Sequence, residues 1–307
     1  MHRGGDPDGP PVLSLHGVGN TGRMWNGHVI VMHPHAAPGA PTALNRLALS
    51  DRLAWLAAVL TVLAAGAGIV VPSLYRDAPF WVEQARGTDV ATLLLAVPIL
   101  VVGLLAARRD VAGRLAVISV QLYLVYNYAI FSFAVAMNPL TVVYIALLGL
   151  AVWSLLLTLS AIDPDAIART MTTRVLRRTS VAVLVAVAVL FGFMWLGQIA
   201  QAAVSGELPP DVARAGLATN PVYALDLALF LPACLLAAAG LLRRTWAGAF
   251  AVPMLVWLFL TSAGIVVAFV FAAQGGAPFA MGPAVMVGAI GVITAALALV
   301  AVVRRGS

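Results

Sequence analysis

The chain has 307 residues, of which 62% are hydrophobic and only 10% are charged. Soluble domains carry about 25% charged residues, so this composition excludes a water-soluble enzyme and predicts a polytopic membrane protein. The net charge is +6, and all 18 basic residues are arginines that lie mainly in short stretches between apolar runs. This distribution indicates a role in membrane topology and argues against binding to nucleic acid.

The first 45 residues contain Gly, Pro, His and charged residues but lack the apolar core of a signal peptide. We expect a disordered cytoplasmic tail over residues 1–45, followed by a transmembrane helical domain over residues 46–307. The first span would then act as an uncleaved signal anchor. Met32 is a second candidate for the start of the protein, so it stays open whether residues 1–31 belong to it.

A short motif in this tail resembles part of an enzyme. Residues 11–25, which include His16-Gly17, resemble the strand and His-Gly loop that form the oxyanion hole of α/β-hydrolases. The chain has no G-x-S-x-G nucleophile elbow, and all five histidines precede the first apolar run. Haem, di-iron and zinc sites also need histidines, and a single cysteine, Cys234, excludes a dithiol pair. We therefore expect no cofactor and no metal, and we favour a membrane protein without catalytic activity over an enzyme.

Eight apolar segments are long enough to cross a bilayer, which takes about 20 residues. They cover approximately residues 53–72, 90–107, 115–137, 139–161, 180–204, 222–242, 246–273 and 282–303. Asn138-Pro139 divides the third from the fourth, and a turn-forming cluster at residues 274–278 divides the last two. The predicted fold class is an all-α, polytopic transmembrane bundle of about eight helices.

The arginines lie unequally on the two sides of these spans. Fifteen fall on the side that holds both termini, and only Arg76, Arg86 and Arg214 fall on the other. Under the positive-inside rule the Arg-rich side is cytoplasmic, with both termini inside and anionic lipids as neighbours. Arg114 is counted in the loop between spans two and three. The abundance of Ala, Gly and Arg is typical of a GC-rich bacterial genome, which indicates the bacterial plasma (inner) membrane.

Two segments that follow the second and sixth spans are similar to each other. Residues 108–113 match residues 243–248 at an offset of 135 residues. Each match follows a span with an aspartate near its outer end, Asp89 in one case and Asp226 in the other. The match predicts two parallel four-helix repeats, formed by spans one to four and five to eight. Apolar sequence also matches itself by chance, so coincidence is the alternative.

Asp226 is the most informative polar residue. Asn220-Pro221 predicts the start of its helix and so places Asp226 about 8 Å along the span. An ionisable group at that depth is costly and usually faces a cavity or a partner. Three roles are open: a carboxylate that binds substrate or a proton, half of an ion pair with an outer arginine, and a side chain that reaches back to the interface. Asp89, at the predicted start of span two, is better explained as a helix cap.

Further polar residues are predicted in the middle and outer parts of spans three, five and six. The five predicted ligand-binding residues are Asp226, Asn127, Tyr126, Tyr223 and Gln198. We expect them to line a pocket that opens to the outside. The alternative is that they join neighbouring helices through hydrogen bonds, each worth about 0.6 kcal/mol.

The run from Tyr126 to Leu140 and the run from Asn220 to Asp226 resemble an uncharacterised family of bacterial multi-pass membrane proteins. The resemblance covers most of residues 75–270 and none of the tail. It implies an eight-helix membrane fold and importance for the Asn, Tyr and Asp positions in those runs. It implies no particular activity.

The leading hypothesis is an integral inner-membrane protein that binds or transports a small molecule through an outward-facing polar pocket. A carboxylate with Tyr and Asn suits a cation, a polyol or proton-coupled exchange. One alternative is a non-catalytic structural, sensory or assembly subunit that contacts another membrane protein. The other is a cofactor-free lipid-modifying enzyme that uses Asp226 and an arginine, although no acid–base pair is visible.

Overall fold

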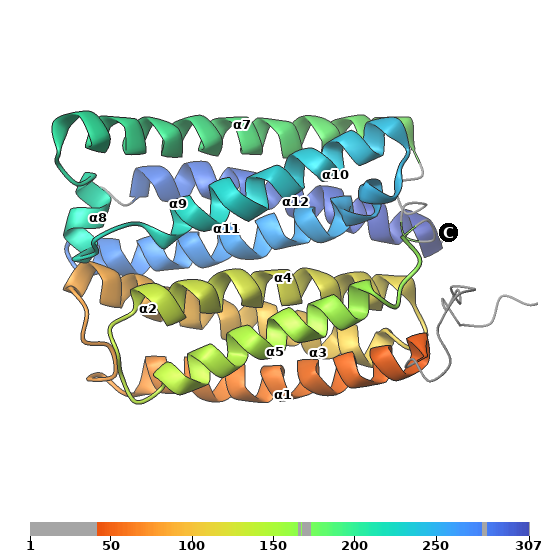
Figure 1. Ribbon diagram of the computed structural model, residues 1–307, viewed down its shortest axis with the longest axis horizontal. Coiled ribbons are helices and arrows are strands. Elements are labelled where there is room, and N and C mark those ends of the chain that lie inside the picture. Colours follow the sequence, from red (N-terminus) through yellow and green to blue (C-terminus); the bar gives the residue numbers. More distant parts are fainter. Residues whose placement is uncertain (1–41, 165–166, 168–172, 278–280, 307) are drawn as a thin grey trace, which may run out of the picture.

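The computed structural model describes residues 42–164, 167, 173–277 and 281–306, and within these ranges every regular element is helical (Figure 1). Eight helical segments in this part of the chain are long and apolar enough to cross a membrane, which confirms the predicted all-α, eight-span fold. The predicted tail lies outside the described residues except for residues 42–45. The hydrolase-like motif at residues 11–25 and the second candidate start at Met32 also lie outside them.

The spans are numbered in chain order. Spans 1 to 4 are α1 (Ala43–Val70); α2 (Pro79–Ala91) with the π-helix η1 (Thr92–Ala96) and α3 (Val97–Ala106); α4 (Val111–Ala134); and α5 (Thr141–Leu159). Spans 5 to 8 are α7 (Arg174–Ser205); α9 (Pro221–Leu225) with the π-helix η2 (Asp226–Phe230) and α10 (Leu231–Arg243); the 3-10 helix η3 (Trp246–Phe250) with α11 (Ala251–Gln274); and α12 (Met281–Gly306). A short helix, α8 (Pro210–Ala215), lies between spans 5 and 6.

Polar residues fix several of the helix starts. Asp110 accepts a hydrogen bond from the backbone N–H of Ala112 at 2.8 Å, and Asn220 accepts one from Val222 at 2.9 Å. Each cap satisfies a backbone donor that the first turn leaves free. Pro221 is the first residue of α9, where its missing N–H costs nothing. The predicted start of span 6 is therefore confirmed.

Spans 1 and 2 begin about ten residues earlier than predicted, at Ala43 and Pro79. The opening turns of these helices carry charged residues, such as Arg46 in α1 and Glu83 in α2, which a search for apolar runs leaves out. Asp89 consequently lies inside span 2, buried at 4% exposure, and does not cap its helix. Arg114 likewise lies in the first turn of α4, so its assignment to a loop was wrong.

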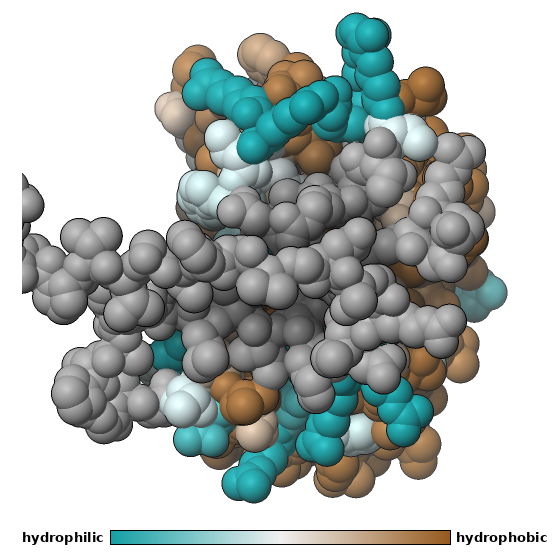
Figure 2. Space-filling model, turned by 90° about the vertical axis from the view of Figure 1, so that its right-hand side faces the viewer, coloured by the Kyte–Doolittle hydropathy of each residue, from teal (hydrophilic) through white to brown (hydrophobic). Residues whose placement is uncertain are grey.

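The two ends of the bundle differ in charge. The loops between spans 2 and 3, 4 and 5, and 6 and 7 lie at the same end as the start of α1 and the end of α12 (Figure 1). We call this the Arg-rich end, and Figure 2 views it with hydrophilic side chains at its periphery. The opposite, Arg-poor end carries Arg76, Arg86 and Arg214.

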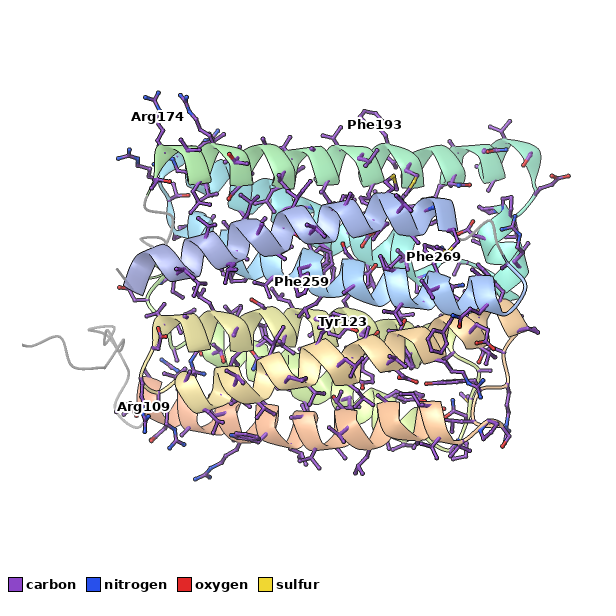
Figure 3. All side chains as sticks on the ribbon, turned by 180° about the vertical axis from the view of Figure 1, so that it is seen from behind. Arg109, Tyr123, Arg174, Phe193, Phe259 and Phe269 are labelled. Carbon is purple, nitrogen blue, oxygen red and sulfur yellow. The ribbon has the colours of Figure 1, made fainter. Side chains whose placement is uncertain are left out.

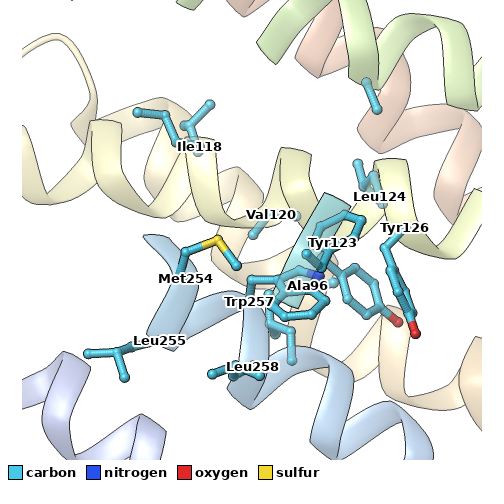
Figure 4. Packing of buried hydrophobic residues seen from close by; sticks show 14 of the residues in the cluster. Ala96, Ile118, Val120, Tyr123, Leu124, Tyr126, Met254, Leu255, Trp257 and Leu258 are labelled. Carbon is cyan, nitrogen blue, oxygen red and sulfur yellow. The ribbon is translucent and has the colours of Figure 1, made fainter. Parts of the chain in front are cut away.

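Spans 1–4 and spans 5–8 form two four-helix halves (Figure 1). They meet where α11 packs against α2 and α4. Figure 4 shows the apolar contact between these halves, with Val120 and Tyr123 of α4 facing Met254 and Trp257 of α11. The most buried span is α4 and the least buried is α7, so α4 lies at the centre of the bundle and α7 at its edge.

The second span of each half contains the same irregularity. The π-helices begin at Thr92 and Asp226, an offset of 134 residues, and each precedes a dipeptide that ends in proline, Val97-Pro98 or Leu231-Pro232. A π turn accommodates one extra residue within an α-helix and is frequent at functional sites. This shared feature supports the two parallel four-helix repeats that the sequence predicts.

Each half also has a tight glycine contact at the Arg-rich end. A Cβ atom on Gly103 would lie 3.2 Å from the carbonyl oxygen of Gly113, and one on Gly240 would overlap the backbone nitrogen of Gly248. These contacts join the second span of each half to the third. They lie beside the connecting turns that carry Arg108-Arg109 in the first half and Arg243-Arg244 in the second. At Gly240 only glycine lets the two backbones approach this closely, whereas a side chain at Gly103 would require its neighbours to shift by a few tenths of an ångström.

Candidate functional site

Asp226 is the first residue of the π-helix in span 6, and it is 7% exposed. The indole Nε1 of Trp195 on α7 donates a hydrogen bond of 2.8 Å to its Oδ2. The other carboxylate oxygen, Oδ1, is buried and has no hydrogen-bond partner. Asp226 also forms no ion pair with an arginine of the described chain, so the ion-pair role is not realised.

Aromatic rings cover one side of Asp226. The ring of Tyr223, one turn earlier on span 6, stacks on Trp195 with their centroids 4.6 Å apart. Its hydroxyl donates to Asp211 of α8 at 3.0 Å, and Asn220 Nδ2 donates to the same carboxylate at 3.1 Å. Asp211 therefore ties the short helix α8 to the start of span 6. This linkage holds Tyr223 and Trp195 in place beside the buried acid.

Three further rings form a cluster that reaches Asp226 through Tyr126, and we call Tyr126, Phe230 and Trp257 the aromatic trio. Tyr126 packs edge-on against Phe230 and Trp257, with centroid distances of 5.0 and 5.5 Å, while Phe230 and Trp257 stack at 4.5 Å. The hydroxyl of Tyr126 interacts electrostatically with Asp226, although Oδ1 of that carboxylate accepts no hydrogen bond of ordinary geometry. The indole Nε1 of Trp257 is buried without a hydrogen-bond partner. The trio thus joins α4, span 6 and α11, and Figure 4 shows two of its members, Tyr126 and Trp257.

The structure gathers three of the five predicted ligand-binding residues. Asp226 and Tyr223 both contact Trp195, Tyr126 interacts with Asp226, and each of these three predicted residues is less than a tenth exposed. Asn127 is buried beside Tyr126 on α4, and Gln198 is half-buried on α7, one turn beyond Trp195. Neither of these two forms a hydrogen bond with the other three. The residues pack against one another in this conformation, and the outward-opening pocket stays a prediction.

Sequence reasoning missed two residues of this site, Trp195 and Asp211. Trp195 lies 31 positions before the carboxylate that it contacts. Its one available signal is chemical: a tryptophan N–H inside a membrane needs an acceptor, and few acceptors exist in this sequence. Asp211 lies outside the predicted spans, in a segment expected to be a loop, and a carboxylate in a loop does not by itself indicate a site.

A cavity of about 240 Å³ lies nearer the Arg-rich end, between the two halves. It is lined by Ile118, Leu159, Ile162, Pro164, Ile167, Trp246, Ala249, Phe250 and Pro253. Ile118 lies eight residues before Tyr126 on α4, and Pro253 lies four residues before Trp257 on α11. At about 1.5 Å per residue these are separations of about 12 Å and 6 Å. The aromatic trio therefore lies between Asp226 and this inner cavity.

The first half holds a second buried carboxylate, Asp89 of span 2. Tyr75, in the loop before that span, donates a hydrogen bond of 2.5 Å to its Oδ2. A Cβ atom on Gly68 would overlap the same oxygen, so glycine at this position leaves room for the Asp89 carboxylate. Burial, and next the charge of Asp89, raise the pKa of the Tyr75 hydroxyl far above its usual value. Tyr75 therefore stays protonated and keeps donating at neutral pH.

Two further polar contacts stabilise the first half near the Arg-rich end. Asp51 of α1 and Arg114 of α4 form a buried ion pair at 2.7 Å. Ser50 Oγ donates to the carbonyl oxygen of Ser154 at 2.8 Å, and Ser154 Oγ donates back to that of Ser50 at 2.9 Å. Thr158 joins this clasp through its hydroxyl, 2.6 Å from Ser50 Oγ. These contacts fasten α1 to α4 and α5.

No protein family, curated protein or solved structure that we compared with the chain matches it. The resemblance to an uncharacterised bacterial family therefore stays a prediction. Among the described residues, no group of three or more His, Cys, Asp or Glu side chains lies close enough to hold a metal ion.

Proposed function

We propose that this multi-pass membrane protein binds a small molecule beside Asp226 and moves it across the bacterial inner membrane. The observation that carries the proposal is the buried oxygen Oδ1 of Asp226, which has neither a hydrogen-bond partner nor a cation beside it. Leaving a carboxylate in this state inside a membrane is costly, and such residues mark substrate and ion pathways. A ligand that supplies the missing donor would remove that cost.

The surroundings of Asp226 favour an organic cation as the ligand. Trp195, Tyr223 and Tyr126 place aromatic rings around the carboxylate. Aromatic faces attract cations, most strongly where water is excluded, and a carboxylate adds the opposite charge. An ammonium group with an apolar body satisfies both features, whereas a polyol would use only the hydrogen bond.

The position of the inner cavity supports movement as well as binding. Asp226 lies toward the Arg-poor end of span 6, the cavity lies toward the Arg-rich end, and the aromatic trio separates them. A substrate would enter from the outside, bind at Asp226 and pass between the halves when the trio parts. The π turn that begins at Asp226 supplies a weakened point in span 6, because its hydrogen-bond pattern departs from that of an α-helix.

Binding can be tested by thermal shift in detergent with short-chain alkylammonium salts, choline and small polyols. We expect an ammonium compound to raise the melting temperature of the wild-type protein and of Glu83→Gln, but not of Asp226→Asn. Glu83 is the matched control, because it is an acid of the same end that pairs with Arg86 at 3.9 Å near the surface. If a polyol, and no ammonium compound, stabilises the wild type but not Asp226→Asn, the binding site at Asp226 is supported and the proposed organic cation is wrong.

Movement is tested separately in proteoliposomes loaded with the compound that binds. The wild-type protein should release it into the medium, and Asp226→Asn should not. Binding in detergent without any release would show that the protein is a receptor or an assembly subunit and would overturn transport. Stabilisation that is equal in wild type and Asp226→Asn would overturn the site itself.

A further inference from the structure

An apolar groove of about 350 Å³ separates α7 from α12 near the Arg-rich end. Its walls are Thr173, Val175, Leu176 and Thr179 on one side and Ile293, Ala296, Leu297 and Val300 on the other. Figure 3 shows α12 diverging from α7 toward the end that carries Arg174. The groove therefore widens toward one surface of the bilayer, in the range of volumes that small-molecule sites occupy.

The corresponding helices of the first half are closed against each other. There α1 and α5 are clasped by the reciprocal hydrogen bonds of Ser50 and Ser154. Ser154 is the fourteenth residue of α5, and Thr294 is the fourteenth residue of α12. Thr294 donates to the backbone of its own helix, to Ile290 or Gly291, and not to α7. The contact that closes α1 against α5 in the first half therefore has no counterpart between α7 and α12 within the described residues. We call the open interface between α7 and α12 the open seam.

Positive charge borders the open seam. Arg174, Arg177 and Arg178 lie in the first two turns of α7, interleaved with the residues that line the groove. None of the three forms an ion pair within the described ranges. The start of a long helix adds a partial positive charge at the same place. An occupant of this groove therefore needs an apolar chain and an anionic head.

We infer that the groove binds an anionic phospholipid of the leaflet at the Arg-rich end. One acyl chain lies between α7 and α12 along Leu176 and Leu297, and the phosphate lies against Arg174 and Arg178 at the surface. The site is independent of Asp226, which lies toward the opposite end of the bundle. A zwitterionic lipid with the same chains fills the groove less well, because its headgroup carries no net negative charge for the arginines.

The charge requirement is tested by native mass spectrometry of the purified protein titrated with phosphatidylglycerol or phosphatidylcholine of identical chains. We expect the wild type to retain phosphatidylglycerol preferentially, and R174Q/R178Q to lose affinity for it by about fivefold for each arginine removed. The matched control is R108Q/R109Q, two exposed arginines of the same end in the first half. A preference that is absent in the wild type, or that survives R174Q/R178Q, would overturn the proposal.

The groove itself is tested by filling it from either wall. Ala296→Trp and Val175→Trp place an indole in the groove, and both positions are exposed, so folding should tolerate them. Leu299→Trp is the control, an exposed position of α12 outside the groove. We expect both filling variants to lose the bound phosphatidylglycerol while the control keeps it. Retention in both filling variants would show that the arginines bind a headgroup without the groove, and would overturn the site.

Discussion

At the scale of single residues, the protein buries two kinds of carboxylate in its spans. Asp51 is matched by a cation, with Arg114 Nη1 at 2.7 Å from its Oδ1. Among the described residues, Asp226 has no cation beside it and interacts only with two neutral groups, the N–H of Trp195 and the hydroxyl of Tyr126. The first arrangement is what structural stability requires of a buried charge, and the second leaves a partner to be supplied. The two acids should therefore respond differently to the same substitution.

Asp51→Asn should destabilise the protein much more than Asp226→Asn. Removing the Asp51 charge leaves the Arg114 guanidinium buried without a partner, at a cost of about 3–5 kcal/mol. An asparagine at position 226 still accepts a hydrogen bond from Trp195. The melting temperature of each variant, measured in detergent, tests this difference. The double variant Asp51→Leu/Arg114→Leu should recover most of the loss, and a large effect of Asp226→Asn would contradict this assignment.

Tyr75→Phe should also destabilise the protein, because it leaves Asp89 without its donor, at a cost of about 1–3 kcal/mol. The pKa of Tyr75 is raised in the folded state, first by burial and then by Asp89. Its contribution is therefore intact below the unfolded value of about 10 and is lost as the pH rises further. The difference in melting temperature between wild type and Tyr75→Phe should narrow above pH 10. A constant difference from pH 7 to pH 11 would argue against this contact.

At the scale of helices, the sequence predicts where apolar runs lie better than where helices begin. Span 6 was placed within one residue, because Asn220-Pro221 marks its start. The starts of spans 1 and 2 were predicted too late, because each helix begins in a segment with charged residues that precedes its apolar run. Asp226 was recognisable because it lies within an apolar span. Its contact with Trp195 was not, since it depends on how α7 packs against span 6.

The glycine contacts between consecutive spans give a test at this scale. Gly240→Ala should destabilise the protein by several kcal/mol or prevent folding, because its Cβ atom would overlap the backbone of Gly248. Gly149→Ala is the matched control: it lies in α5 with open space around its Cβ position. Alanine there should stabilise the helix by about 0.5–1 kcal/mol. The yield of monodisperse protein and its melting temperature measure both, and equal behaviour of the two variants would refute the close contact.

At the scale of the whole molecule, the two ends must face different compartments. The positive-inside rule predicts that the Arg-rich end faces the cytoplasm. The protein offers a convenient assay, because its single cysteine, Cys234, is fully buried. Ser205 and Ser160 are both exposed, Ser205 at the Arg-poor end and Ser160 at the Arg-rich end.

Ser205→Cys should therefore react with a membrane-impermeant maleimide applied to intact cells, whereas Ser160→Cys should react only after the membrane is broken. The wild-type protein should stay unlabelled in both conditions, because Cys234 is inaccessible. The reverse labelling pattern would show that the Arg-rich end faces outward. The proposed direction of transport would then be reversed as well.

Each half of the protein crosses the membrane four times, an even number, so the second half starts from the same side of the membrane as the first half. The arginines at the start of α7 then give the second half its own orientation signal, separate from those of the first half. Insertion of spans 5–8 does not have to depend on how spans 1–4 were inserted. The chain is in this sense two modules joined in tandem. We expect the two polypeptides produced by a break between Ile162 and Thr173 to insert separately and to assemble along α2, α4 and α11.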